Sequence, residues 1–171
     1  MTFDPGSHKP GAADGSMYLQ TPGDFVVAFT RYNGRQDNKN GKTFLKMAGV
    51  VIHGEPGSVV GKRFTQRVYT TRESYERIGA MCAAMGWDEQ FDLESDEDCK
   101  RVFLRRPFKA KFKTETRDGK VFASIAFFEQ KLTEEESAVM SEWVANAELD
   151  PDSDADDAPD VPPPSDDDIP F

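Results

Sequence analysis

The order in which the hydrophobic period changes along this chain constrains its fold most strongly. Apolar residues alternate with polar or small ones in five segments, a period typical of β-strands. These segments are residues 24–32, 43–53, 59–70, 101–116 and 121–128. Polar, Gly-rich breakers separate them, and Asp118-Gly119 between the last two is typical of a two-residue hairpin turn.

A helical period interrupts the alternation after the third predicted strand. Apolar residues there recur at spacings of three and four, ending at a glycine: Tyr75, Ile78, Met81, Cys82, Met85 and then Gly86. The order of three strands, one helix and two strands favours an OB-fold, a mainly β fold with α. We therefore expect a five-stranded β-barrel in the order β-β-β-α-β-β, although other small α+β folds share this order.

Charge is divided unevenly along the chain. Residues 1–131 contain all 21 Lys and Arg and 17 of the 31 Asp and Glu, which gives this part a net charge of +4. Residues 132–171 contain the other 14 acidic residues and no Lys or Arg. A mildly basic body with a strongly acidic tail is typical of a nucleic-acid-binding protein whose tail has a separate role. A charge of +4 alone would be unremarkable.

Composition and charge together predict four parts. Residues 1–23, rich in Gly and Pro, form an expected flexible arm, and residues 24–131 form the OB-fold domain. A C-terminal helix is predicted over residues 132–147. Residues 148–171 are nearly all Asp, Pro, Ala and Ser, a composition too poor in apolar residues to fold alone, so a disordered acidic tail is expected.

The predicted strands offer both features that sequence-independent binding of single strands requires, namely cations for phosphates and aromatic rings for bases. By alternation, Arg63, Arg67 and Tyr69 share one face of the third strand, and five cations cluster within residues 105–113. A solvated basic strand face is the simpler alternative. The expected DNA-binding residues are Arg31, Tyr32, Arg35, Lys39, Lys42, Phe44, Arg63, Arg67, Tyr69, Phe103, Arg105, Lys109, Lys111, Lys113 and Phe122. The expected interior aromatics are Phe25, Phe29, Phe64, Phe108, Phe112 and Phe127.

No pattern in the sequence indicates catalysis. We find no nucleophile–base pairing and no Gly-rich phosphate loop, and the two cysteines, Cys82 and Cys99, lack zinc-site spacing. A non-enzymatic protein without metal or other cofactor is therefore expected. No signal peptide and no apolar run of membrane-spanning length is present, so we expect a soluble, cytoplasmic protein.

The last six residues join a run of acids to an apolar tip: Asp166, Asp167, Asp168, Ile169, Pro170 and Phe171. Such a tip can fill an apolar pocket, and the α-carboxylate of Phe171 can accept hydrogen bonds from an Arg or Lys beside that pocket. It resembles the C-terminal tip of bacterial single-stranded DNA-binding proteins (SSB), which recruits replication, recombination and repair enzymes. The resemblance is confined to this tip. The body, with no Trp in its predicted strands, looks more like the divergent single-stranded DNA-binding proteins of bacteriophages.

The resemblance and the basic body favour a protein that binds and protects single-stranded DNA with little sequence preference. In a bacterial cell or phage-infected host it would recruit host replication and repair enzymes through residues 166–171. The alternative hypothesis is a protein-interaction decoy or adaptor that competes for the pockets of SSB partners without binding DNA. We also expect the acidic tail to occupy the basic groove when DNA is absent. The sequence leaves open whether the chain forms a homo-oligomer and whether it prefers DNA to RNA.

Overall fold

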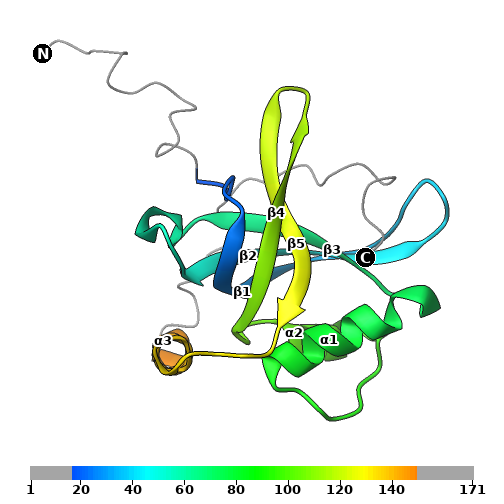
Figure 1. Ribbon diagram of the computed structural model, residues 1–171. Helices are drawn as coiled ribbons and strands as arrows, with labels where there is room; N and C mark the ends of the chain where they lie inside the picture. Colours follow the sequence, from blue (N-terminus) through cyan, green and yellow to red (C-terminus); the bar gives the residue numbers. More distant parts are fainter. Residues whose placement is uncertain (1–16, 150–171) are drawn as a thin grey trace, which may run out of the picture.

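The computed structural model describes residues 17–149, so residues 1–16 of the predicted arm, residues 150–171 of the predicted disordered tail and, with them, the tip at residues 166–171 lie outside the described residues. Its elements are shown in Figure 1. In chain order they are β1 (Gly23–Asp37), β2 (Thr43–His53), the 3-10 helix η2 (Gly57–Val59), β3 (Arg63–Tyr69), the 3-10 helix η3 (Arg72–Ser74), α1 (Tyr75–Met85), α2 (Asp96–Phe103), β4 (Phe108–Arg117), β5 (Lys120–Glu129) and α3 (Glu134–Leu149).

The five strands form one antiparallel sheet in the order β3-β2-β1-β4-β5. This confirms the mainly β class, the five strands and the placement of a helix between the third and fourth of them. The sheet is open, because no ladder joins β3 to β5 among the described residues. The closed barrel expected from the sequence is therefore not what the described strands form.

A short segment before β1 links the two edges of this open sheet. Leu19 donates its N–H to the Arg63 carbonyl of β3 at 2.7 Å and accepts from the Ala123 N–H of β5 at 3.2 Å. A side chain adds a second link, since Gln66 Oε1 accepts from the Ile125 N–H at 3.1 Å. Leu19 is only 3% exposed. The expected flexible arm is thus wrong for the residues just before β1, which dock because their backbone groups satisfy both strand edges.

The core lies on the inner face of the curved sheet and is rich in phenylalanine. The predicted interior rings Phe25, Phe29, Phe64, Phe108 and Phe112 are all at most 3% exposed. Neighbouring rings in this group lie 5.1–5.8 Å apart in tilted or edge-to-face pairs, the preferred geometry for aromatics. Helix α1 packs against β4 and β5 (Figure 1), where its Arg77 donates to two β5 carbonyls at 2.7 and 2.8 Å.

Phe127 is an exception to the predicted interior, since it is 50% exposed. The cause is a bulge in β5. Lys111 pairs with Phe127 but the next residue, Phe112, pairs with Ile125, so Ala126 is an extra residue in its strand. One extra residue reverses the alternation beyond it and turns the ring outward.

Helix α2 covers residues 96–103, so its last three residues take the place of the start of the strand predicted over residues 101–116. The Ser95 side chain caps the helix by accepting from the Asp98 N–H at 3.2 Å, and acids fill the first turn, where the helix dipole favours them. Cys99, Val102 and Phe103 are fully buried on one face. The fourth strand consequently begins at Phe108 rather than at residue 101.

Helix α3 packs on the sheet beside β2 and begins with a reciprocal cap. Glu136 Oε1 accepts from the Thr133 N–H at 2.8 Å, while Thr133 Oγ1 accepts from the Glu136 N–H at 3.1 Å. Lys109 of β4 ties this first turn to the sheet through ion pairs of 3.1 Å to Glu136 and 3.7 Å to Glu129. The predicted C-terminal helix is therefore present and extends to Leu149.

Candidate nucleic-acid interface

Three basic side chains lie on the outer face of the sheet where β1, β2 and β3 run side by side. In the register of these strands Lys46 is opposite Arg67, and Ala48, two residues on, is opposite Arg31. Residues 46 and 48 of β2 share one face because side chains alternate along a strand. Arg31, Lys46 and Arg67 therefore share the outer face, opposite the phenylalanine core.

A polar pocket of about 610 Å³ opens at the β1 end of this face. Its cations come from three elements, with Arg31 on β1, Lys46 on β2 and Lys100 on α2. The Lys100 ammonium lies 5.5 Å from the centre of the Tyr32 ring, within cation–π range. The remaining lining residues are Asn33, Gly34, Gln36 and Asp96. We call this the Tyr32 pocket.

A network around Asp96 fixes α2 against β1 and so forms one wall of the Tyr32 pocket. Tyr32 Oη donates to Asp96 Oδ1 at 2.5 Å, and the Arg35 guanidinium lies 3.2 Å from the same oxygen. Arg35 also donates to the Leu93 carbonyl at 2.8 Å. Arg35 was predicted to contact DNA, but its guanidinium is engaged in holding α2 in place.

The protonation states of this network are fixed near neutral pH. Partial burial and the hydrogen bond to Asp96 raise the pKa of Tyr32 well above its ordinary value. The hydrogen bonds from Tyr32 and Arg35 lower the pKa of Asp96. The pair therefore consists of a neutral phenol and a carboxylate, and the carboxylate offsets part of the positive charge of Arg31, Lys46 and Lys100.

Two of the residues predicted to stack on bases lie on the outer face, beside Lys46 and Arg67. Phe44 and Tyr69 are opposite one another in the β2–β3 register, with ring centres 5.3 Å apart. The Arg67 guanidinium carbon lies 4.5 Å from the centre of the Phe44 ring. Both rings are only 2% exposed, so they are not the open stacking faces that the sequence predicted. Phe103 is wrong as a stacking residue for another reason, because it is fully buried on α2.

A second outer surface lies on the β4–β5 hairpin. Lys111 is opposite the exposed Phe127, with its ammonium 5.4 Å from the ring centre. Lys113 and Phe122, both predicted to bind DNA, lie on the same hairpin, where Phe122 is half-buried and opposite Glu115. This surface combines cations with an open aromatic face, but Lys113 lies 3.6 Å from the Glu115 carboxylate.

Other predicted cations are placed apart from these two surfaces. Lys109 is held by Glu129 and Glu136 under α3. Arg105 precedes β4 in a left-handed backbone conformation with φ 60°, and its N–H donates to the Phe29 carbonyl. Lys109, Lys111 and Lys113 share the outer face of β4, where they alternate with the buried Phe108, Ala110 and Phe112, but Arg105 lies outside the strand. In the first hairpin Lys39 is exposed at the turn and Lys42 forms a 2.8 Å ion pair with Glu73, whereas Arg63 starts β3 beside Leu19.

Lys46 and Lys100 belong to the Tyr32 pocket but were missed from the sequence. The outward position of Lys46 follows from alternation in the segment 43–53, between the buried Leu45 and Met47. Lys100 could be placed only by recognising α2. Its sequence signal was the cap, in which Ser95 is followed three residues later by Asp98.

Residues 17–149 contain no group of three or more His, Cys, Asp or Glu side chains arranged to hold a metal ion. Within the same residues, no helix has the length and apolar character needed to cross a membrane.

Comparison with known proteins places the chain in a family. No curated protein matches its sequence. Residues 12–139, which cover the whole sheet, α1, α2 and the start of α3, match a family described as "Protein of unknown function (DUF669)". Because this match spans most of its length, the chain belongs to the DUF669 family.

Proposed function

We propose that this protein binds single-stranded DNA, with little sequence preference, across the outer face of β1, β2 and β3. The observation that carries the proposal is the convergence of Arg31, Lys46 and Lys100, from three separate elements, on the Tyr32 pocket. Cations from separate elements that meet at one polar surface suit a phosphate backbone. The exposed turn of the first hairpin, with Lys39, adjoins this face and extends the positive surface.

The proposed contacts explain a lack of sequence preference. Arg and Lys bind phosphates, which are the same for every nucleotide, and aromatic rings stack on any base. Phe127 beside Lys111 supplies an open ring of this kind on β5. We assign the Tyr32 pocket to the strand backbone and the Phe127 surface to a base.

We further propose that the sheet is an open form of the OB architecture. Support comes from the strand order, with β1 pairing both β2 and β4, and from the Leu19 and Gln66 links between the edge strands. An OB-fold presents an outer strand face and its flanking loops to oligonucleotides. The outer face of β1–β3 and the β1–β2 hairpin are the corresponding parts of this chain.

Residues 166–171 complete the proposal as the segment that recruits replication, recombination and repair enzymes of the host. The support is chemical: three aspartates favour encounter with a basic surface, and Ile169 and Phe171 can fill an apolar pocket. Deleting Phe171 is expected to abolish partner binding and leave the affinity for DNA unchanged.

The direct test is titration of fluorescein-labelled oligo(dT) and of a labelled duplex with the full chain, followed by anisotropy. We expect preferential binding of the single strand, and we expect Lys46→Gln to weaken it more than Lys131→Gln, which removes the same charge from an exposed residue outside both surfaces. Equal affinity for both oligonucleotides, or no binding, would refute the proposal and favour the adaptor alternative.

A further inference from the structure

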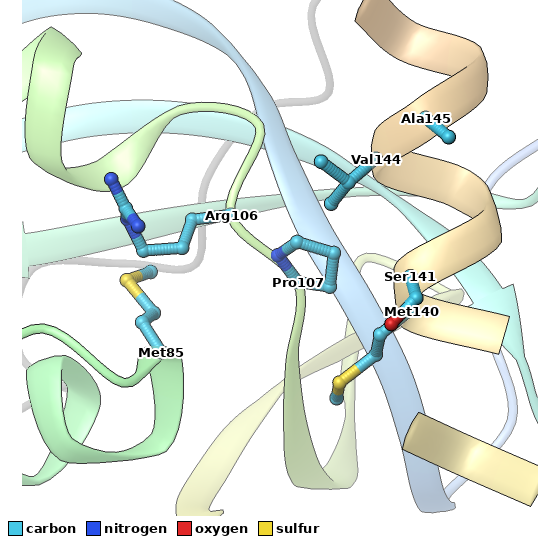
Figure 2. A pocket seen from close by; sticks show the side chains of 7 residues that line it. All are labelled: Met85, Arg106, Pro107, Met140, Ser141, Val144 and Ala145. Carbon is cyan, nitrogen blue, oxygen red and sulfur yellow. The ribbon is translucent and has the colours of Figure 1, made fainter. Parts of the chain in front are cut away.

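A second pocket, of about 480 Å³, lies between α1 and α3 and shares no lining residue with the Tyr32 pocket. Figure 2 shows its walls. Met140 and Val144 project from α3 toward Pro107, and Met85 and Arg106 lie on the far side. Ser141 and Ala145 complete the lining. We call this the Met140 pocket.

The walls of the Met140 pocket are mostly apolar. Met140 and Val144 are four residues apart, so they share one helix face, and both are only partly buried. Met85 ends α1 and is 7% exposed. The methionine side chains are flexible and adapt readily to apolar ligands of irregular shape. The pocket therefore suits one or two apolar side chains.

One side of the Met140 pocket is cationic. The Arg106 guanidinium carbon lies 4.7 Å from the centre of the Trp87 ring, and the Arg101 guanidinium carbon lies 5.3 Å from it. Arg106 Nε donates to the Val102 carbonyl at 2.9 Å, which fixes the side chain at the pocket wall. Arg101 also forms an ion pair of 3.4 Å with the half-buried Asp98. Two arginines held on one ring beside an apolar pocket suit a ligand that joins acidic to apolar groups.

We propose that residues 166–171 of the same chain dock in the Met140 pocket. Their composition complements it, because Ile169 and Phe171 match the apolar walls and Asp166 to Asp168 match the arginines. The chain leaves α3 at Leu149, one turn beyond the Val144 and Ala145 wall. The 22 residues that follow span roughly 25 Å as a flexible chain, enough to return to a pocket formed partly by the helix they leave.

Docking there would hide the recruiting tip until a partner with a stronger pocket displaces it. This regulation adds to the proposed function but does not depend on DNA binding, because the Met140 pocket and the outer face of β1–β3 are separate. The two ideas can therefore fail independently.

The test uses the full chain labelled with ¹³C at the methionine methyl groups. Spectra of the wild type and of Phe171→Ala are expected to differ at Met85 and Met140, where loss of the ring changes the methyl environment. Met47 and Met81, both fully buried in the core, serve as internal controls and should not shift. Adding the peptide Asp-Asp-Asp-Ile-Pro-Phe to the Phe171→Ala chain should restore the wild-type positions saturably, and the same peptide ending in Ala should not.

Arg106→Gln in the Phe171→Ala chain should weaken this peptide binding about tenfold, since a charge-assisted hydrogen bond is lost. Unchanged Met47 and Met81 signals will show that this variant is folded. Identical Met85 and Met140 signals in wild type and Phe171→Ala would overturn the proposal. So would shifts that grow with protein concentration, which would assign the pocket to the tip of a second copy.

Discussion

Replacing Arg31, Lys46 and Lys100 together by glutamine removes the three cations of the Tyr32 pocket and keeps side chains that can form hydrogen bonds. The three residues lie on three different elements, and none is in the buried core. The variant is therefore expected to retain the fold. Its circular dichroism and thermal unfolding should match those of the wild type.

The magnitude follows from counterion release. The logarithm of the affinity for single strands falls with the logarithm of salt concentration by about 0.7 for each phosphate contact. If each cation contacts one phosphate, the triple variant lowers this slope by about 2 and weakens binding about a hundredfold at 0.1 M salt. Each single substitution should account for roughly one third of the slope change.

The assay is fluorescence anisotropy of labelled oligo(dT) between about 50 and 200 mM salt, a range in which phosphate contacts change the affinity strongly. A triple substitution of surface cations outside both proposed DNA surfaces, at Arg72, Arg101 and Lys131, provides the matched control. A slope in the Tyr32-pocket variant equal to that of the control variant would refute the assignment of this pocket to the DNA backbone. A reduced affinity with an unchanged slope would also refute it, because phosphate contacts cannot be lost without a change in salt dependence.

Four further predictions address other parts of the molecule. Phe127→Ala should weaken oligo(dT) binding by about 1–3 kcal/mol without changing the salt slope, because it removes one stacking face; an unchanged affinity in the same titrations would exclude the β4–β5 surface. Deleting residues 149–171, which removes the aspartates of residues 150–160 as well as the tip, should raise the affinity for single strands at low salt, and an equal affinity would show that these aspartates do not shield the groove. Phe29→Ala should lower the free energy of unfolding by about 3–5 kcal/mol in urea titrations, since the ring is fully buried. Burial of Glu136 tends to raise the pKa of its carboxyl group, but the Thr133 N–H and Lys109 hold that pKa below its usual value. The stabilising effect of the ionised Glu136 should therefore be present at neutral pH and fade below about pH 4. Wild type and Glu136→Gln should then differ in melting temperature at pH 7 and converge in acid, and a constant difference would contradict this.

Much of the fold could be predicted because the local signals agree with the tertiary structure. The alternation around Phe25 and Phe29, the helical period ending at Gly86 and the Asp118-Gly119 turn each correspond to an element of the structure. Gly86 ends α1 with φ 76°, a conformation that favours glycine.

Bulges and long-range contacts account for the features that could not be predicted from the sequence. A single extra residue at Ala126 reversed the predicted direction of Phe127, and no pattern in one strand reveals a bulge that depends on its partner. The links made by Leu19 are backbone hydrogen bonds, which any residue except proline can donate, so the sequence carried no signal for them. The Tyr32 pocket was only half predicted for a related reason, because Lys100 reaches it through α2, an eight-residue helix inside a segment dominated by acids.

The Leu19 link has a consequence for synthesis of the chain on the ribosome. Gln20, beside Leu19, donates to the Val121 carbonyl, a residue 101 positions later in the chain. The segment around Leu19 contacts the edge of β3, which is translated long before β5. It cannot link the edges of β3 and β5 until residues beyond Ala123 have left the exit tunnel. A nascent chain holding only β1, β2 and β3 presents an exposed strand edge for several seconds at ordinary rates of translation, roughly 5–20 residues per second. The partly exposed charges along these strands, among them Arg31 and Lys46, oppose edge-to-edge association during that interval, before any ligand has reached them.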